Sequence, residues 1–209
     1  MELADLRRDF GKYAFDLQQT PENPGELFSL WLKNAAELAI SELNAMVLST
    51  VSMENKPSSR VVLLKAFKEG QFVFYTHYES RKGTELELNP QACLLFFWKE
   101  LERQVRIEGK VDKIPYEQSN RYFKSRPRES QLNAVSSPQS KPISGIEEID
   151  EIKNKLLSSG QPIECPPFWG GYALTPEYYE FWQGGPDRLH RRLSYFLKNG
   201  LWTKQMLAP

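Results

Sequence analysis

The sequence predicts an α+β fold, made mainly of antiparallel β-strands with peripheral helices. From Ala45 onward, short runs rich in β-branched and aromatic residues are separated by turn residues, a pattern typical of an antiparallel barrel or sandwich. Near the C-terminus, Asn199-Gly200 separates two such runs, and this dipeptide favours a two-residue hairpin turn. The chain has 209 residues, of which 12% are aromatic, so it can form a substantial core. We therefore expect a single domain over residues 1–209.

Helices are expected in the N-terminal segment, residues 1–41. Spaced apolar residues indicate a first helix, which ends at the proline- and glycine-containing break at 20–25. These apolar residues are Leu3, Leu6, Phe10 and Leu17. Apolar residues from Leu27 to Ala39 follow the period of an α-helix and predict a second, amphipathic helix.

Strands of the barrel are expected from residue 45 to residue 114. Turn residues at 55–57 and 68–70 divide the first part into strands, which we place at 45–52, 59–67 and 71–76. A short helix from Arg81 to Asn89 follows. Two further strands are placed near 91–99 and 102–114.

The region from residue 115 to residue 158 is predicted to be helical. Pro127 breaks the first helical stretch, which runs from 115 to 136. Ser144 and Glu147 have the spacing of a capping box, which opens a helix that runs to about Ser158. Strands return over residues 169–209 and end in the Asn199-Gly200 hairpin.

Composition argues against several classes of protein. Lys plus Arg and Asp plus Glu are equal at 27, so no overall charge favours nucleic acid or an acidic membrane. Cys93 and Cys165 stand far apart and only two histidines accompany them, which argues against structural zinc. The N-terminus lacks the apolar core of a signal peptide, and the longest apolar run, 92–98, is too short to cross a bilayer. We expect a cytoplasmic protein.

The segment from Gly184 to Arg192 carries the first candidate binding residues. It contains a Gly-Gly-Pro turn, and a strand that resumed there would place Arg188, His190 and Arg192 on one face. Positive charges on one face repel one another unless an anion lies against them, and arginine binds phosphate in a bidentate manner. For these residues alone, a solvated basic edge strand is the alternative.

Two further segments place cations beside the ends of predicted elements. Arg60 and Lys65 flank an apolar strand and would face opposite sides of it, so a shared ligand needs a bulge or a wrapping chain. Residues 80–83 open the next helix, where free amide groups beside Arg81 and Lys82 form an anion site. Ordinary surface bases remain an alternative for this segment alone.

A polar strand residue and a basic helix end complete the candidate set. Gln104 lies in a strand-like run, and its amide can both donate to and accept from the edge of a heterocycle. Tyr122 and Arg126 stand four residues apart on one helical face, and Pro127 can start a new helix with Ser130 in its first turn. An exposed glutamine and a solvated helix end are the alternatives.

The sequence contains no Ser/His/Asp triad, P-loop, Rossmann glycine pattern or metal-binding cluster. It offers candidate anion sites, aromatic side chains and one strand amide instead. This combination indicates a phosphorylated aromatic cofactor that performs the chemistry itself.

In their order along the chain, these segments resemble the pyridoxine/pyridoxamine 5′-phosphate oxidase family, whose members are FMN-dependent enzymes with a split β-barrel. The matching segments run through nearly the whole chain. They are 60–65, 74–76, 80–82, 103–105, 122–131, 137–140, 181–185, 188–192 and the terminal Leu-Ala-Pro.

The resemblance implies roles for individual residues. FMN would be held by Arg60, Val61, Val62, Leu63, Leu64, Lys65, Tyr75, Thr76, Arg81, Lys82, Gln104, Gln139, Ser140, Trp182 and Arg192. The phosphate of the substrate would be held by Lys65, Tyr122, Arg126 and Ser130, while Arg188 and His190 would act at its ring. Arg7 matches a further substrate-side position. Three residues later the family often has tyrosine, and Phe10 in this chain lacks that hydroxyl.

The resemblance also implies a homodimer with FMN at the subunit interface. The reaction would be oxidation of pyridoxine or pyridoxamine 5′-phosphate by O2 to pyridoxal 5′-phosphate, with release of H2O2 and, from the amine, NH3. The alternatives are a split-barrel protein with another substrate, a carrier of pyridoxal phosphate without flavin, and a nucleic-acid-binding module. The matches at 122–130 and 188–190 argue against another substrate. A carrier without flavin is disfavoured by Gln104, Trp182 and the Arg81-Lys82 pair. The zero net charge argues against a nucleic-acid-binding module.

Overall fold

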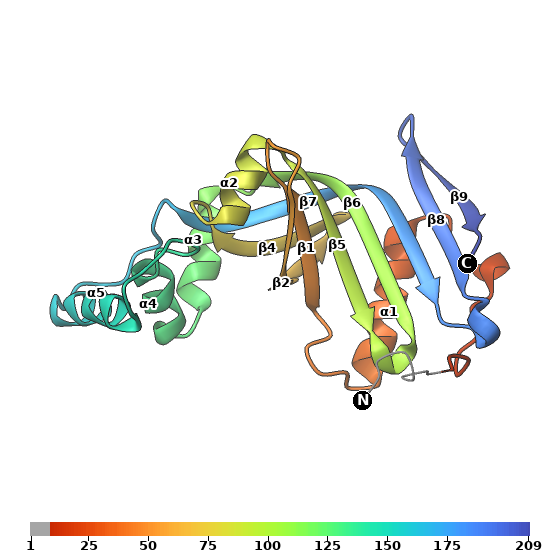
Figure 1. Ribbon diagram of the computed structural model, residues 1–209, viewed down its shortest axis with the longest axis horizontal. Helices are drawn as coiled ribbons and strands as arrows, with labels where there is room; N and C mark the ends of the chain where they lie inside the picture. The colour runs from red at the N-terminus through yellow and green to blue at the C-terminus, as the bar shows by residue number, and fades with distance from the viewer. Residues whose placement is uncertain (1–8) are drawn as a thin grey trace.

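The computed structural model describes residues 9–209, which form a curved antiparallel sheet with helices packed around it (Figure 1). The sheet has nine strands in the order β2-β1-β5-β6-β7-β4-β3, and β8 and β9 extend it from β7. The strands are β1 Ala45–Val51, β2 Pro57–Leu63, β3 Ala66–Lys68, β4 Gln71–His77, β5 Gln91–Trp98, β6 Arg103–Lys113, β7 Trp169–Gln183, β8 Arg191–Lys198 and β9 Leu201–Leu207. All of these strands pair in an antiparallel manner, which confirms the predicted fold class.

The helices flank the sheet and the region that follows β6. They are α1 Pro24–Glu37, α2 Arg81–Leu88, α3 Tyr116–Ser125, α4 Arg128–Ser136 and α5 Ile146–Ser158, with short 3-10 helices η2 Leu17–Gln19, η3 Lys99–Leu101 and η4 Pro186–Arg188. The predicted break at Pro127 is confirmed, since α3 ends before it and α4 begins after it. The predicted hairpin is confirmed too, because Asn199 and Gly200 between β8 and β9 adopt the positive φ angles of 52° and 79° that a type I′ turn requires.

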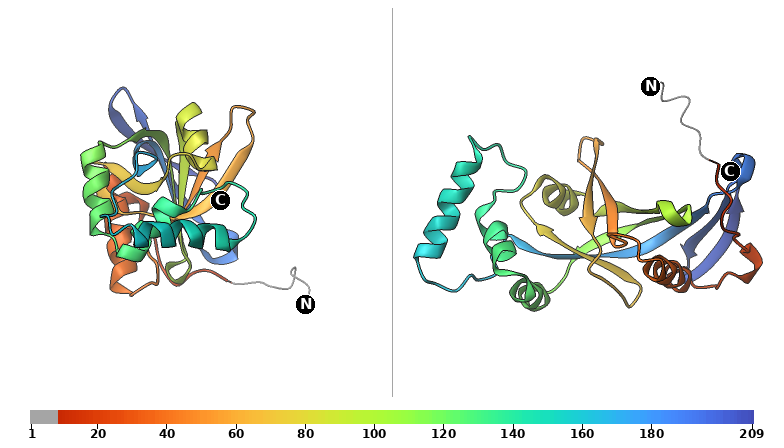
Figure 2. Two further views of the ribbon diagram at one scale, coloured as in Figure 1. Left: turned by 90° about the vertical axis from the view of Figure 1, so that its left-hand side faces the viewer. Right: turned by 90° about the horizontal axis from the view of Figure 1, so that it is seen from below.

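The long strand β7 joins the two ends of the molecule (Figure 2). It pairs with β4 near its N-terminal end, with β8 near its C-terminal end and with β6 along its length. The register between β6 and β7 shifts at Gly109, because β7 carries an extra, unopposed residue, Glu177. Position 109 has no room for a side chain, since a Cβ on Gly109 would lie 2.1 Å from the carbonyl oxygen of Thr175. Because side chains alternate along a strand, this bulge exchanges the faces of β7: Leu174 points into the main core before it and Tyr179 after it.

Helix α1 covers one side of the main core. Asn23 caps the helix by accepting the backbone N–H of Gly25 at 2.8 Å, and Pro24 occupies the first turn. The buried face of the helix carries Phe28 and Trp31. The ring of Phe28 packs against three aromatic rings of the sheet with centroids 4.8–5.2 Å away, so aromatic contacts fix α1 to the sheet.

A second, smaller core lies where α3 packs on the start of β7. Its buried residues are Phe123, Cys165 and Trp169. Trp169 precedes the bulge and faces away from the main core, toward α3, where its ring meets that of Phe123 at 5.2 Å. Helices α4 and α5 extend from this core to the end of the molecule at the left of Figure 1.

The predicted N-terminal helix is wrong where the structure can test it. Leu3 and Leu6 lie outside the described residues, but the chain from Asp9 to Asp16 is irregular. The buried carboxylate of Glu102 accepts the backbone N–H groups of Gly11 at 2.8 Å and Lys12 at 3.2 Å. These long-range hydrogen bonds, which no local pattern indicates, satisfy two backbone N–H groups of the irregular segment.

Two further predictions need correction. The strand expected over 59–67 is divided into β2 and β3, with Leu64 and Lys65 between them. The expected capping box is displaced by one residue: Gly145 is the N-cap of α5, and Glu148, not Glu147, accepts from Ser144, through the hydroxyl at 3.0 Å and the backbone N–H at 3.2 Å. Sequence spacing did not predict this shift because the carboxylate turns back to a residue outside the helix.

Candidate functional site

A pocket of about 990 Å³ opens between the edge of β2, the start of α2 and the α3–α4 pair. It brings together most of the residues that the sequence predicted for a phosphorylated cofactor and substrate. Those that line it are Arg60, Val61, Val62, Leu63, Lys65, Tyr75, Thr76, Arg81, Lys82, Tyr122, Arg126, Ser130, Gln139 and Ser140.

The start of α2 forms one end of this pocket. Ser80 is the N-cap of the helix, and its hydroxyl accepts from Lys82 Nζ at 3.3 Å. Lys82 Nζ also donates to Gln139 Oε1 at 2.8 Å, and Thr76 Oγ1 donates to the same oxygen at 3.3 Å. Burial and the positive charge of Arg60 lower the pKa of Lys82 to about 8. A helix N-terminus and a buried lysine therefore meet here, as an anion site requires.

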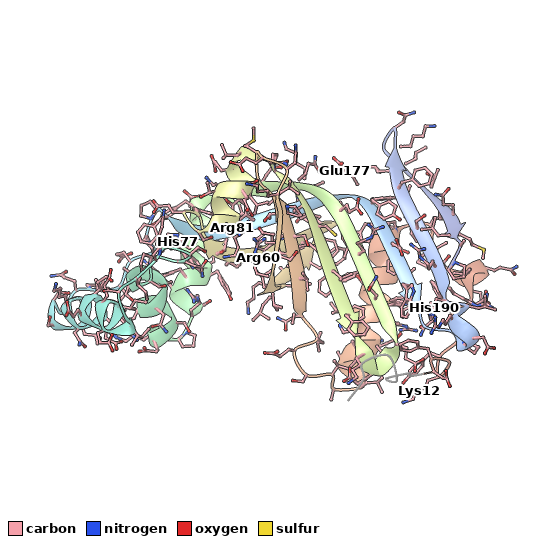
Figure 3. All side chains as sticks on the ribbon, in the orientation of Figure 1. Lys12, Arg60, His77, Arg81, Glu177 and His190 are labelled. Atoms are coloured by element: carbon pink, nitrogen blue, oxygen red, sulfur yellow. The ribbon has the colours of Figure 1, made fainter. Side chains whose placement is uncertain are left out.

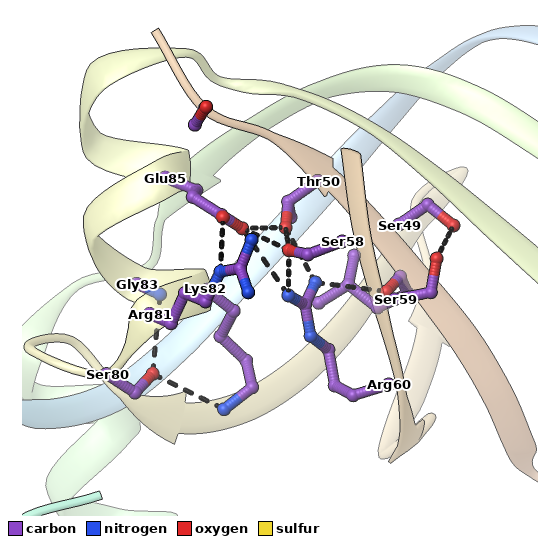
Figure 4. Close-up of polar contacts among 12 residues, drawn as sticks. Ser49, Thr50, Ser58, Ser59, Arg60, Ser80, Arg81, Lys82, Gly83 and Glu85 are labelled. Atoms are coloured by element: carbon purple, nitrogen blue, oxygen red, sulfur yellow. Dashed lines mark hydrogen bonds and ion pairs between the residues drawn. The ribbon is translucent and has the colours of Figure 1, made fainter. Parts of the chain in front are cut away.

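Arg60 and Arg81 lie beside this helix start and are bound to the buried side chain of Glu85 (Figure 4). Glu85 Oε1 accepts from Arg81 Nε at 2.9 Å, and Oε2 accepts from Thr50 Oγ1 at 2.5 Å, Ser58 Oγ at 2.6 Å and Arg60 Nη2 at 3.4 Å. Burial alone would raise the pKa of Glu85, but the hydrogen bonds from Ser58, Thr50 and Arg81 outweigh burial and lower it to about 2.

Lys65 reaches the same pocket as Arg60 because the chain leaves the strand between them. β2 ends at Leu63 and β3 begins at Ala66, so the alternation of a regular strand does not extend to Lys65. Leu64 differs from the other predicted contacts, since its side chain is buried in the main core. Its backbone N–H donates to Asn44 O at 2.8 Å.

Stacked aromatic rings form the other end of the pocket. The ring of Tyr75 stacks on Tyr122 at 3.9 Å and on Trp169 at 5.5 Å between centroids. The guanidinium of Arg126 lies 4.7 Å from the centroid of Trp169. Arg126 Nη1 is buried and has no acceptor within residues 9–209. A buried donor without a partner fits a site that takes an anionic ligand. Ser130 lines this end from the first turn of α4.

Among the residues that line the pocket and that sequence reasoning missed are Trp169 and His77. Trp169 opens a Trp-Gly-Gly segment in which a Cβ at Gly170 would lie 2.1 Å from the hydroxyl of Tyr78. Two glycines after an aromatic residue are a signal for close packing, and that signal could have marked Trp169. His77 follows the predicted pair Tyr75-Thr76 in β4; burial lowers its pKa, and nothing in its spacing pointed to the pocket.

The remaining predicted residues form a separate group, here called the C-terminal cluster: Gln104, Trp182, Arg188, His190 and Arg192. Gln104 of β6 pairs with Trp182 of β7, which pairs with Arg192 of β8. The ring of His190 lies 4.6 Å from that of Trp182. Figure 3 places His190 near the right-hand end of the molecule, well away from Arg60 and Arg81 near its middle. Within a single chain, the predicted site residues are therefore divided between two distant places.

Two residues outside the C-terminal cluster, Phe10 and Glu180, hold its side chains in place. The ring of Phe10 meets the edges of Trp182 at 5.7 Å and His190 at 5.9 Å, so the N-terminal segment covers this cluster. Glu180 is buried and accepts from Arg106 at 2.7 Å and Arg192 at 2.9 Å. Burial would raise the pKa of Glu180, but these two guanidinium groups outweigh it and lower the pKa.

The predicted alternation of Arg188, His190 and Arg192 along a strand is wrong. Asp187 and Arg188 adopt positive φ angles of 52° and 62° in η4, and β8 begins only at Arg191. Of the three residues, Arg192 alone lies in the strand. His190 instead accepts the backbone N–H of Gly185 on Nδ1 at 3.3 Å.

Arg7, a predicted substrate contact, lies outside the described residues. Within residues 9–209, no group of three or more His, Cys, Asp or Glu side chains could hold a metal ion. In the same part of the chain, no helix is long and apolar enough to cross a membrane.

Comparison with known sequences gives consistent matches over the whole chain. A family described as pyridoxamine 5′-phosphate oxidase matches residues 32–150, and one described as pyridoxine 5′-phosphate oxidase C-terminal dimerisation region matches residues 169–209. A pyridoxine/pyridoxamine 5′-phosphate oxidase of Herminiimonas arsenicoxydans is 46% identical, with 100% of each chain covered. One of Pseudomonas putida is 47% identical over 99% of this chain and 98% of its own.

Two solved structures are similar as well. PhzG from Burkholderia lata, solved in complex with tetrahydrophenazine-1-carboxylic acid, has a TM-score of 0.90 and 30% identity over 95% of this chain and 99% of its own. A pyridoxamine 5′-phosphate oxidase-related, FMN-binding protein from Nostoc punctiforme has a TM-score of 0.70 and 18% identity over 93% of this chain and 100% of its own, a likeness of fold.

Proposed function

Because the chain belongs to the pyridoxine/pyridoxamine 5′-phosphate oxidase family, we propose that it uses FMN to oxidise pyridoxine or pyridoxamine 5′-phosphate to pyridoxal 5′-phosphate. The observation that carries this proposal is the presence of two cationic ends in one pocket. One end combines Arg60, Arg81 and Lys82 with a helix start, and the other has Arg126 above an aromatic stack. A pocket for one phosphorylated ligand needs only one such end.

The end at α2 fits the phosphate of FMN. Arg81 and Lys82 of α2 and Arg60 of β2 would bind its oxygens, and Thr76 and Gln139 would add polar contacts. The chemistry that bound FMN would supply is redox chemistry: two electrons and a hydrogen would leave the substrate carbon that becomes the aldehyde, and O2 would finally take the electrons to give H2O2. The donor set, with cations and neutral hydrogen-bonding groups but no metal-binding cluster among residues 9–209, suits this phosphorylated organic group.

The other end fits the phosphate of the substrate. Arg126 offers its buried, unpaired Nη1, and Lys65, Tyr122 and Ser130 line the pocket around it. Stacking on Trp169 restricts the guanidinium and keeps it in place before the ligand arrives. Such preorganisation lowers the entropic cost of orienting the substrate.

The C-terminal cluster would complete the pocket of a second subunit. The family match at 169–209 is described as a dimerisation region, and it includes Trp182, Arg188, His190 and Arg192. Each of two pockets in a twofold homodimer would then combine residues of both chains. His190 accepts a hydrogen bond on Nδ1, which leaves Nε2–H able to donate to a substrate oxygen or nitrogen. Arg188 would hold the substrate ring beside it.

The experiment that tests the proposed function mixes FMN-loaded protein with pyridoxine 5′-phosphate without O2 and follows the flavin absorbance. Bleaching of the flavin is expected, followed by recovery and release of pyridoxal 5′-phosphate and H2O2 when air is admitted. A flavin that neither pyridoxine nor pyridoxamine 5′-phosphate reduces would refute this reaction. The family membership would stand, and the substrate would have to be sought elsewhere.

A further inference from the structure

We propose that Glu85 is a positioning residue, which holds Arg60 and Arg81 in place for the phosphate of FMN and adjusts the charge of that end of the pocket to match a phosphate dianion. The inference rests on the proposed function, because it takes the flavin phosphate as the ligand. Glu85 does not line the pocket itself, so it would act only through the two arginines.

The carboxylate of Glu85 connects three elements that meet at the pocket (Figure 4). It belongs to α2, and it accepts hydroxyl groups from Thr50 of β1 and Ser58 of β2. Both of its oxygens are engaged, and the residue is only 5% exposed. A carboxylate satisfied on both oxygens in a buried position has a defined orientation, and so do the groups that it binds.

The two arginines are held in different ways. Arg60 Nη1 also donates to Leu48 O at 3.1 Å and to Thr50 Oγ1 at 2.6 Å, so its guanidinium is fixed from several sides. Arg81 is 60% exposed on its side chain, and within residues 9–209 the contact of its Nε with Glu85 is the only hydrogen bond of that side chain. That contact leaves its two terminal nitrogens able to bind an anion. Arg81 therefore depends on Glu85 for its position more than Arg60 does.

The charges at this end of the pocket also depend on Glu85. Arg60, Arg81 and Lys82 supply three positive charges, and Glu85 supplies one negative charge. The remaining charge of +2 balances a phosphate monoester, which carries about −1.5 to −2 near neutral pH. Without the carboxylate, the three cations would repel one another in a partly buried space, and the charge would exceed that of the ligand.

The test compares the affinity of the full chain for FMN and for riboflavin, which has the same ring system without the phosphate. Glu85→Gln keeps the size of the side chain and removes its charge. We expect FMN to bind roughly ten- to a hundredfold more weakly to E85Q, measured by the change of flavin fluorescence on titration, with the affinity for riboflavin unchanged. Glu87→Gln, an exposed glutamate of the same helix, is the matched control and should bind both flavins as the wild type does.

A double-mutant cycle separates positioning from damage to the fold. In an Arg81→Ala background, Glu85→Gln should weaken FMN binding much less than it does in the wild type, because the arginine that depends most on Glu85 for its position is gone. The inference is overturned if E85Q binds FMN as the wild type does, or if it loses riboflavin and FMN equally. Should E85Q fail to fold, Thr50→Val removes one hydrogen bond to the same carboxylate, and unchanged FMN affinity in T50V would overturn it. A wild-type chain that binds no FMN would instead refute the proposed function.

Discussion

Lys82 is a buried lysine at the phosphate end of the pocket, and its charge depends on pH within an accessible range. Burial and the neighbouring Arg60 lower its pKa to about 8, so the ammonium group loses its proton as pH rises through that value. Guanidinium groups in general stay protonated at such pH values, so the lysine is the cation that changes. We expect the affinity for FMN to be greatest below pH 8 and to fall above it, when one of three cations is lost.

The effect is measured by titrating the apoprotein with FMN at pH values from about 6.5 to about 9.5, a range that brackets this pKa. The phosphate is already mostly dianionic there, since its second pKa is about 6, so a decrease reports the lysine. In Lys82→Met the affinity should be lower throughout and nearly independent of pH. A variant that still lost affinity over this range would show that another group titrates.

Arg126 is the corresponding residue at the substrate end. Arg126→Ala removes the guanidinium that lies over Trp169 and leaves FMN contacts in place. We expect KM for pyridoxine 5′-phosphate to rise roughly ten- to a hundredfold, because a charge-assisted contact to phosphate is lost, with FMN affinity unchanged. Steady-state kinetics and a flavin titration test this. Arg128→Ala, exposed at the start of α4, should change neither quantity.

At the scale of elements, Ser80 connects the stability of α2 to its ability to bind phosphate. Its hydroxyl caps the first turn, accepts from Lys82 and donates to His77 O at 2.7 Å. We expect Ser80→Ala to lower the free energy of unfolding by about 1 kcal/mol, the usual effect of losing an N-cap. The same substitution should also lower the affinity for FMN. Chemical denaturation with the FMN titration measures both. Thr84→Ala, exposed on the same helix, should leave FMN affinity unchanged.

Elements with local signals could be predicted from the sequence, and elements fixed by distant contacts could not. The helical period of its apolar residues predicted helix α1, Pro127 predicted the α3–α4 break, and the Asn-Gly pair predicted the β8–β9 hairpin. The segment from Asp9 to Asp16 is irregular rather than helical, and contacts with Glu102 and Trp182, far away in the sequence, hold it. The strand expected at Arg188 failed because two non-glycine residues adopt left-handed φ angles, which no local rule demands.

At the scale of the whole molecule, the predicted site is divided in two. Local sequence patterns were sufficient to predict the cations at the start of α2 and Arg126 as binding residues, and the fold brings them into one pocket. Such patterns could not reveal that Trp182 and His190 lie far from that pocket, because only the course of β7 through the sheet decides this. The proposed homodimer reunites the two groups.

Mixed dimers test whether each site is shared between chains. Arg126→Ala impairs the pocket, and Arg188→Ala impairs the C-terminal cluster, so each homodimer should turn over slowly. If one site uses both chains, co-expression of the two variants produces heterodimers with one intact site. About a quarter of all sites, and hence about a quarter of wild-type activity, should return when the subunits combine at random. Activity no higher than that of the separate variants would contradict a shared site.

The bulge at Glu177 constrains how this sequence can change in length. Trp169 and Trp182 stand an odd number of positions apart, yet both face away from the main core, because the unopposed residue between them restores the alternation. Deleting Glu177 would turn Trp182 and Glu180 inward and expose Phe181, and one inserted residue elsewhere in β7 would do the same. The exposed loop segment at 159–162, before the buried Cys165, carries no such restriction. Insertions and deletions that preserve function are therefore expected in that loop and not between the two tryptophans.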